Sequence, residues 1–359
     1  MTKKIIFSTG GTGGHIFPAI NLMKHFSDNG YEVLLITDAR GENFIKNYPR
    51  FRSYVLKAGT PTNKNFFKRL LSFLVIFYSI IKSIVILKKE KPDLIFGFGG
   101  YVSFPTSFAS KFFNLPLVIY ENNMVLGRTN KYLSLFSKKI FVAKKITINF
   151  PEKYKSKTYE VGPILDKNII NYSISKKNTN KENFSILVLG GSQGAEIFGK
   201  IIPPVIKLIK NEGHQIEIIQ QCIISQKSLI VDFYKKNNIK NYVFQFDKDI
   251  LALILSSDLA ITRCGASTTA ELTHTLTPFI AVPFPHSMDN HQLLNAKYYE
   301  SLGCCWTIEQ GDFNSKNLFN LMMEIMKDKK KLENICENMK KNNSRDVYVK
   351  VENAVKEFI

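Results

Sequence analysis

Residues 5–18 read IIFSTGGTGGHIFP, a short apolar run followed at once by four glycines and a histidine. An apolar run this short, bounded by glycine, is typical of a buried parallel strand. Glycines permit positive φ angles and a close approach of the backbone to a ligand, and the helix that we expect to begin near Pro18 would present free N–H groups at its positive end. The stretch therefore predicts a βα unit whose turn binds a phosphate or a sugar diphosphate.

The same alternation of short apolar runs and helical patterns continues along the chain, which favours an α/β fold with doubly wound parallel sheets. It restarts after residue 180, and 359 residues are enough for two domains of ordinary size. Residues 166–183, rich in Lys, Asn and Ser, separate the two halves. We therefore expect domains at 1–163 and 164–340, with ligands bound between them at the carboxyl ends of the strands. The expected strands are 5–8, 32–37, 94–97, 117–120 and 139–143 in the first half, and 185–189, 216–220, 243–246, 259–262 and 279–282 in the second.

The composition is that of a folded globular protein, with 45% hydrophobic and 22% charged residues. The formal net charge of +19 favours an anionic partner such as a phosphorylated substrate or an anionic membrane surface. Only seven of the 49 cations are Arg, the residue on which nucleic-acid readers depend, so no nucleic-acid partner is expected. The five cysteines fit no CxxC or zinc spacing, and the first apolar stretch is too short for a signal peptide. These features predict reduced thiols in a cytoplasmic protein.

Residues 70–87 read LLSFLVIFYSIIKSIVIL, which is apolar around most of a helical circumference, with Lys68, Arg69, Lys88 and Lys89 near its ends. Three interpretations stay open. The segment is a crossover helix buried in the first domain, or a helix that also presents an apolar, cation-rimmed face to an anionic bilayer, or a transmembrane span. Lys82 interrupts the 18-residue run, which disfavours the span.

Three further loops follow expected strands. Residues 97–105 and 190–195 are rich in glycine, and either loop could be simple structural punctuation. Residues 263–271 read RCGASTTAE and open a helix, so Ser267 and Thr268 can meet a diphosphate at its N-terminus. Glu271, about one turn further, can accept hydrogen bonds from the two hydroxyls of a ribose.

Two alternatives come from other classes of protein. A nicotinamide-dependent dehydrogenase would use Asp38, which ends the second strand where an acid meets a ribose, but Ile16 stands where the third glycine of GxGxxG belongs. A non-enzymatic protein that binds a membrane surface or nucleic acid would explain the charge of +19 and leave the loops unexplained.

Six segments, in this order and at these spacings, closely resemble the MurG family of peptidoglycan glycosyltransferases: GGTGGHIFPA, FGGYVSFP, ENNMVLGRTN, GGSQGA, RCGASTTAEL and DNHQLLNA. The resemblance implies a GT-B fold of two Rossmann-like domains with an interdomain cleft. The first domain would take the lipid acceptor, with a last helix over about 341–359 packing back on it, and the second would take UDP-N-acetylglucosamine.

The reaction implied by this resemblance is inverting transfer of N-acetylglucosamine to undecaprenyl-pyrophosphoryl-N-acetylmuramyl-pentapeptide (lipid I). The product would be lipid II, used in peptidoglycan synthesis, cell-wall biogenesis, cell shape and cell division. The implied location is peripheral, on the cytoplasmic side of the inner membrane.

The resemblance also implies a set of site residues. His15 and Glu121 are the candidates for the general base; an imidazole suits this role near neutral pH, but the sequence does not choose between the two. Three positions depart from the family pattern, because His291 replaces a glutamine, Gly199 replaces an asparagine, and residues 162–166 lack an arginine. Substrate contacts are implied for Thr12, Gly13, Gly14, Asn123, Asn130, Ser192, Gln193, Arg263, Ala266, Thr268, Glu271, His291 and Gln292.

No cofactor and no metal are expected. Residues 247–249 read DKD, the letters of the DxD motif that holds a metal in GT-A glycosyltransferases. They lie between an expected strand and a helix expected to begin near Ile250, which is a capping position. Charge on the departing diphosphate would instead be met by helix N-termini and Arg263.

Overall fold

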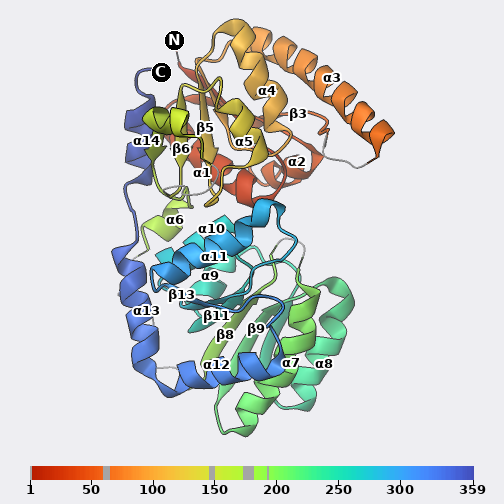
Figure 1. Ribbon diagram of the computed structural model, residues 1–359, viewed down its shortest axis with the longest axis vertical. Helices are drawn as coiled ribbons and strands as arrows, with labels where there is room; N and C mark the ends of the chain where they lie inside the picture. The colour runs from red at the N-terminus through yellow and green to blue at the C-terminus, as the bar shows by residue number, and fades with distance from the viewer. Residues whose placement is uncertain (1, 60–64, 145–149, 173–181, 192–193) are drawn as a thin grey trace. The chain divides into compact units, whose positions relative to one another are not determined.

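The computed structural model describes residues 2–59, 65–144, 150–172, 182–191 and 194–359, and the chain divides into two compact units. Unit 1 comprises Met1–Asp166 and Ser344–Ile359, and unit 2 comprises Lys167–Asn343 (Figure 1). The chain therefore leaves unit 1 once and returns to it once. Both crossings fall three residues beyond the expected boundaries at 163 and 340.

Unit 1 is built on a seven-stranded parallel sheet with the order β3-β2-β1-β4-β5-β6-β7. Ile5, Ile6 and Phe7, on an inner strand of this sheet, are fully buried, as expected for a parallel strand covered on both faces. The strands are β1 (Lys4–Ser8), β2 (Glu32–Thr37), β3 (Arg52–Val55), β4 (Leu94–Gly97), β5 (Leu117–Glu121), β6 (Lys139–Val142) and β7 (Thr158–Glu160). The helices are α1 (Gly13–Asp28), α2 (Ala39–Ile45), α3 (Phe66–Glu90), α4 (Ser103–Ala109), η1 (Ser110–Phe113), α5 (Arg128–Leu133), η2 (Glu152–Lys157) and α14 (Val347–Val355).

Unit 2 repeats this plan on a six-stranded parallel sheet with the order β10-β9-β8-β11-β12-β13. The strands are β8 (Phe184–Leu189), β9 (Ile216–Gln221), β10 (Lys240–Phe244), β11 (Leu259–Thr262), β12 (Phe279–Ala281) and β13 (Cys305–Thr307). The helices are α6 (Lys167–Ile170), α7 (Glu196–Asn211), η4 (Ile224–Gln226), α8 (Lys227–Lys236), α9 (Ile250–Leu255), α10 (Ala266–His274), η5 (Met288–Asn290), α11 (His291–Ser301), α12 (Ser315–Lys327) and α13 (Lys329–Lys341).

Some boundaries differ from the sequence-based expectations. The helix α1 begins at Gly13, not near Pro18, so the last two glycines of the first loop and His15 belong to its first turn. The strand β10 starts three residues earlier than expected and stops before Phe246. The sequence does not predict the short strands β3, β7 and β13, because RSYV, TYE and CWT are not continuous apolar runs.

The helix α3 has two different halves. Its buried residues all lie in the C-terminal half, at Ser79, Ser83, Ile86, Leu87 and Glu90. Its N-terminal half is exposed although it is apolar: Phe67 is 78% exposed and Leu71 is 61% exposed. A wholly buried crossover helix is therefore the wrong interpretation for residues 66–78. Among the described residues, α3 is the one helix that is long and apolar enough to cross a membrane, and 22% of its most apolar window is buried.

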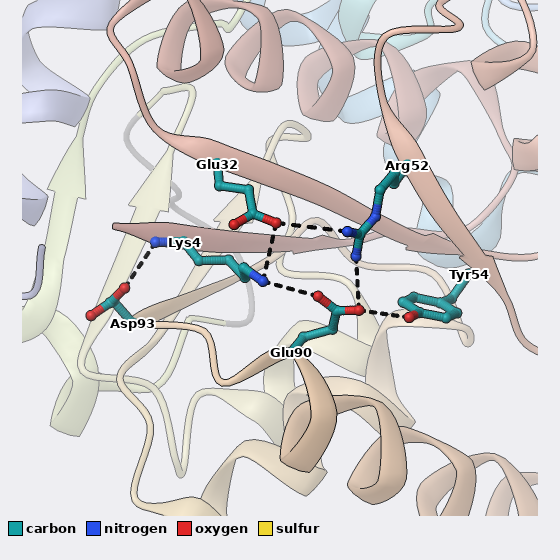
Figure 2. A network of polar contacts seen from close by, with 6 residues as sticks. All are labelled: Lys4, Glu32, Arg52, Tyr54, Glu90 and Asp93. Carbon is teal, nitrogen blue, oxygen red and sulfur yellow. Dashed lines mark hydrogen bonds and ion pairs between the residues drawn. The ribbon is translucent and has the colours of Figure 1, made fainter. Parts of the chain in front are cut away.

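Polar contacts anchor the C-terminal half of α3 to unit 1. Ser79 Oγ donates a hydrogen bond to the Lys57 carbonyl oxygen at 2.9 Å, and Lys82 Nζ donates one to the Val55 carbonyl oxygen at 3.0 Å. The last residue, Glu90, lies at the centre of the network in Figure 2 and contacts three residues on two strands, β1 and β3. Its carboxylate accepts from Lys4 Nζ at 3.0 Å, from an Arg52 guanidinium nitrogen at 2.8 Å and from the Tyr54 hydroxyl at 2.6 Å.

Candidate active site

Two glycine turns meet at the carboxyl end of the unit 1 sheet. The Gly10 amide donates a hydrogen bond to the Gly99 carbonyl oxygen at 3.3 Å, and a Cβ on Gly10 would lie 3.3 Å from Gly100 Cα. Gly99 and Gly100 have φ angles of 82° and 75°, which side chains other than glycine rarely adopt. Glycine is therefore required in both turns so that the two backbones can touch.

His15 and Asn130 converge on the second of these turns. A Cβ placed on Gly99 would lie 3.2 Å from His15 Cε1 and 3.4 Å from Asn130 Nδ2. Thr12 and Gly14 are exposed and His15 is half-buried, and the side chain of the N-cap residue Thr12 makes no capping hydrogen bond. The first turn of α1 thus presents its backbone and an imidazole together beside a glycine turn.

The Glu121 carboxylate is buried and accepts four hydrogen bonds. Oε1 accepts from the Asn123 amide at 3.1 Å and from Asn123 Nδ2 at 3.0 Å. Oε2 accepts from the Gly127 amide and from Asn130 Nδ2, both at 2.9 Å. With 1% exposure, this carboxylate holds the loop between β5 and α5 and orients Asn130. Three predicted site residues, Glu121, Asn123 and Asn130, are therefore joined in one cluster.

Asp38, the residue on which the dehydrogenase alternative depends, is used as a helix cap. Its Oδ1 accepts a hydrogen bond from the Gly41 amide at 2.9 Å, and its Oδ2 pairs with the Arg40 guanidinium at 3.0 Å. It is 6% exposed. Both oxygens are therefore occupied by the N-terminus of α2.

In unit 2, residues 263–271 form a loop after β11 and open a helix, as the sequence predicts. The helix α10 begins at Ala266 after the N-cap Gly265, which has no side chain to cap it. Thr268 and Glu271 lie on its first two turns and are half-buried. The third glycine loop approaches the same place, since a Cβ on Gly191 would lie 4.0 Å from Arg263 Cβ. Ser192 and Gln193 lie outside the described residues.

Arg263 is buried beneath the loops of unit 2. Its guanidinium donates to the carbonyl oxygens of Val282 and Pro283 at 3.0 and 3.2 Å, and to Gln310 Oε1 at 2.6 Å. The guanidinium carbon also lies 5.0 Å from the ring centroid of Phe198 and 5.4 Å from that of Phe284. Burial lowers the pKa of Arg263 from its ordinary value, although a guanidinium keeps its charge in proteins. Arg263 thus supports the loop after β12 and places a positive charge under it.

The pair His291 and Gln292 opens the helix α11. Gln292 Oε1 accepts hydrogen bonds from the Cys264 amide at 3.1 Å and the Phe284 amide at 3.0 Å, so it joins the loops that follow β11 and β12. His291 Nδ1 lies 2.8 Å from the Met288 carbonyl oxygen, to which it can only donate. In that tautomer Nε2 is the acceptor atom of the ring.

The DKD sequence forms a cap. Asp249 is the N-cap of α9 and accepts from the Ala252 amide at 3.2 Å, as expected from its position. Asp247 accepts from the Asp249 amide at 2.8 Å and from the Tyr242 hydroxyl at 2.7 Å. Within the part of the chain that the structure describes, no group of three or more His, Cys, Asp or Glu residues could hold a metal ion.

Two parallel α/β units, each with glycine turns at the carboxyl ends of its strands, form the pair of Rossmann-like domains that is expected of a GT-B fold. Residues 5–142 match the N-terminal domain of glycosyltransferase family 28, and residues 185–351 match its C-terminal domain. The chain belongs to glycosyltransferase family 28.

Individual relatives of the chain carry names that are more specific than the family name. The chain is 36% identical to a Pelagibacter ubique protein over 95% of its own length and 94% of that protein, and 35% identical to a Rickettsia bellii protein over 99% and 100%. Both are named UDP-N-acetylglucosamine–N-acetylmuramyl-(pentapeptide) pyrophosphoryl-undecaprenol N-acetylglucosamine transferase. The expected family, fold class and enzyme class are therefore confirmed.

Solved structures show the same fold. The crystal structure of Acinetobacter baumannii MurG matches with a TM-score of 0.80 and 22% identity, covering 99% of this chain and all of that one. The S. aureus MnaA–UDP co-structure matches with a TM-score of 0.71 and 14% identity, covering 99% of this chain and 97% of that one.

Proposed function

We propose that this chain transfers N-acetylglucosamine from UDP-N-acetylglucosamine to lipid I and so forms lipid II. The observation that carries the proposal is the family match over both units of the chain, at an identity of 33–37% to relatives named for that reaction. The test is a transfer assay with labelled UDP-N-acetylglucosamine and a lipid I analogue. Formation of a β-linked disaccharide product supports the proposal. Binding of NAD without any sugar transfer would favour the dehydrogenase alternative.

His15 is the proposed general base. Inversion requires the acceptor hydroxyl to lose its proton as it attacks the anomeric carbon from the face opposite the departing UDP. An imidazole can take that proton near neutral pH, and His15 lies half-buried in an exposed helix turn. Glu121 is less suited, because its two oxygens already accept four hydrogen bonds in a site that is 1% exposed. We assign Glu121 the role of a positioning residue that holds Asn123 and Asn130.

The pH dependence of kcat/KM separates these roles. Glu121→Gln should lower kcat/KM, because each carboxylate oxygen accepts two hydrogen bonds and the Gln amide nitrogen would face two of the four donors, but the acid limb of the profile should remain. His15→Gln should remove that limb. The opposite pattern, with the limb lost only in Glu121→Gln, would make Glu121 the base.

On the donor side, the N-terminus of α10 is the proposed site of the diphosphate and Glu271 the proposed partner of the ribose. The N–H groups at the start of α10, whose N-cap is Gly265, and the positive helix end favour an anion, and the Arg263 guanidinium adds a fixed positive charge in the preceding loop. This proposal also includes the substrate contacts that the family resemblance implies for Thr12, Gly13, Gly14, Ser192, Gln193, Thr268, His291 and Gln292.

The exposed half of α3 is the proposed contact with the anionic inner-membrane surface on the cytoplasmic side. Large apolar side chains cover it, and the cations Lys68 and Arg69 lie among them. Neighbouring η1 adds Phe112, which is 63% exposed. A surface contact fits better than a span, because a span would have to break the hydrogen bonds that Ser79 and Lys82 make with unit 1.

Vesicle binding tests this surface. Replacing Lys68, Arg69, Lys88 and Lys89 by Gln should weaken binding to anionic vesicles, since each cation contributes about 1 kcal/mol near such a surface and salt screens it. The matched control replaces the exposed Lys207, Lys227, Lys235 and Lys236 of unit 2, which removes the same charge elsewhere. Equal weakening by both variants would show that only net charge matters and would reject α3 as the contact.

A further inference from the structure

A chain of hydrogen bonds connects two segments of unit 1 through Tyr120 and Asn122. The Ile164 amide donates to the Tyr120 hydroxyl at 3.1 Å, and this hydroxyl lies 2.9 Å from Asn122 Oδ1. Asn122 Nδ2 lies 3.4 Å from the Gly14 carbonyl oxygen. One end of the chain is therefore the segment just before the crossing into unit 2 at Asp166, and the other end is the residue that precedes His15.

The sequence explains why the Gly14 carbonyl needs a side-chain donor. In a helix this carbonyl accepts from the amide four residues later, but that residue is Pro18, which has no N–H. The missing backbone bond lies in the turn that carries His15. Asn122 supplies a donor in its place, which helps to fix the first turn of α1.

The direction of the chain is also fixed. A carbonyl oxygen only accepts, so the amide nitrogen of Asn122 must face Gly14 and its oxygen must face the Tyr120 hydroxyl. That hydroxyl then donates to Asn122 and accepts from Ile164. The Gly162 carbonyl oxygen, a second acceptor, is farther from the hydroxyl at 3.3 Å. Tyr120 and Asn122 are 2% and 5% exposed, so water competes little for these bonds.

We propose that Tyr120 and Asn122 are positioning residues that set the place of His15 relative to residues 162–164. The proposal rests on the proposed function of His15 as the base. It gives the segment 162–166 a role: although it lacks the arginine of the family pattern, its backbone is tied through two side chains to the turn that bears the imidazole. Loss of the Tyr120 hydroxyl should therefore slow the chemical step and leave donor binding unchanged.

The experiment compares Tyr120→Phe with Tyr348→Phe in the full chain. Tyr348 is a matched control, because its buried hydroxyl also bonds the same segment, donating to the Leu165 carbonyl oxygen at 2.6 Å, and Tyr348 is not a member of the chain that runs through Tyr120 and Asn122. We measure kcat and KM for UDP-N-acetylglucosamine with a short-chain lipid I analogue, the Kd for UDP by calorimetry, and thermal unfolding. Tyr120→Phe should lower kcat about tenfold with an unchanged Kd for UDP, a loss that corresponds to one hydrogen bond. Tyr348→Phe should lose similar stability and keep its kcat within about twofold.

A double-mutant cycle tests the coupling. If the two residues act in one chain, Tyr120→Phe combined with Asn122→Ala should be no slower than the slower single variant. Additive losses, or equal kcat in Tyr120→Phe and Tyr348→Phe, would overturn the proposal. A wild-type chain that transfers no sugar would refute the proposed function instead. In that case the NMR signals of the His15 ring still test whether Tyr120 positions His15, because these signals should shift in Tyr120→Phe and not in Tyr348→Phe.

Discussion

Replacing Glu90 by Gln should loosen the C-terminal half of α3, because it removes the buried charge at the centre of the network in Figure 2. Burial alone raises the pKa of Glu90, but the hydrogen bonds from Tyr54 and Lys4 and the charges of Lys4 and Arg52 outweigh it and lower the pKa from 4.5 to about 2. The folded state therefore prefers the ionised carboxylate. Gln keeps the shape of the Glu90 side chain but carries no charge, so the stabilisation that comes from the ionised carboxylate is lost.

The size of the effect follows from this pKa. At 1.36 kcal/mol per pKa unit, the difference between 4.5 and about 2 corresponds to about 3 kcal/mol. We expect about 2 kcal/mol, since the Arg52 partner is 62% exposed and screened by water. Because the pKa is lowered in the folded state, this stabilisation is complete above pH 4.5 and disappears as the pH falls toward 2. The difference between wild type and variant should shrink over the same range.

Hydrogen exchange measured by mass spectrometry at pH 7 is the assay. A loss of about 2 kcal/mol should speed exchange in peptides from β3 and the C-terminal half of α3 by roughly 30-fold, while unit 2 peptides stay unchanged. The control is Glu152→Gln, which removes an exposed carboxylate paired with Lys155 at 2.7 Å and should change exchange by about twofold at most. Equal protection in wild type and Glu90→Gln, or a difference that persists at pH 2, would refute the reasoning.

Three further outcomes concern the reaction. His15→Ala should lower kcat by about 100-fold or more, measured in single turnovers, and a loss confined to KM would make His15 a binding residue. Glu271→Ala should raise KM for UDP-N-acetylglucosamine by roughly 10- to 100-fold, because the ribose hydroxyls lose a charged acceptor, and an unchanged KM in a folded variant would remove Glu271 from the site. EDTA should leave the rate intact, since Asp249 caps α9 and Asp247 accepts from the Asp249 amide; loss of activity that Mg²⁺ or Mn²⁺ restores would contradict this.

The sequence predicts the central strands well and the edges of the sheets poorly. Buried parallel strands such as β4 (LIFG) and β11 (LAIT) are continuous apolar runs, and their observed bounds agree with the expected ones. The strand β3 (RSYV) lies at a sheet edge where polar side chains are tolerated, so the run that would reveal it is absent. The sequence predicts the start of α1 at the wrong residue, because proline is common in the first turn of a helix. Pro18 instead lies inside α1, and Asn122 compensates for its missing N–H.

For the candidate site, motifs indicate which residues gather but not what each one bonds. The place of Glu121 after a strand is readable, yet its four hydrogen bonds depend on how residues 122–130 fold back. The partners of Arg263 are farther away in the sequence, since Gln310 follows it by 47 positions and Phe198 precedes it in the helix α7. No local pattern identifies such partners, because only the folded sheet brings them together.

The return of α14 to unit 1 affects how the protein is made on the ribosome. Val347, Val351 and Val355 are fully buried in unit 1, and Lys139 Nζ donates to the Ala354 carbonyl oxygen at 2.6 Å. These residues are translated only after the 177 residues of unit 2, from Lys167 to Asn343. At about 5–20 residues per second, the apolar surface that α14 covers stays open on the nascent chain for roughly 10–35 s. The first unit to emerge is thus the last to be completed, and a messenger that ends before codon 347 would leave it permanently unfinished.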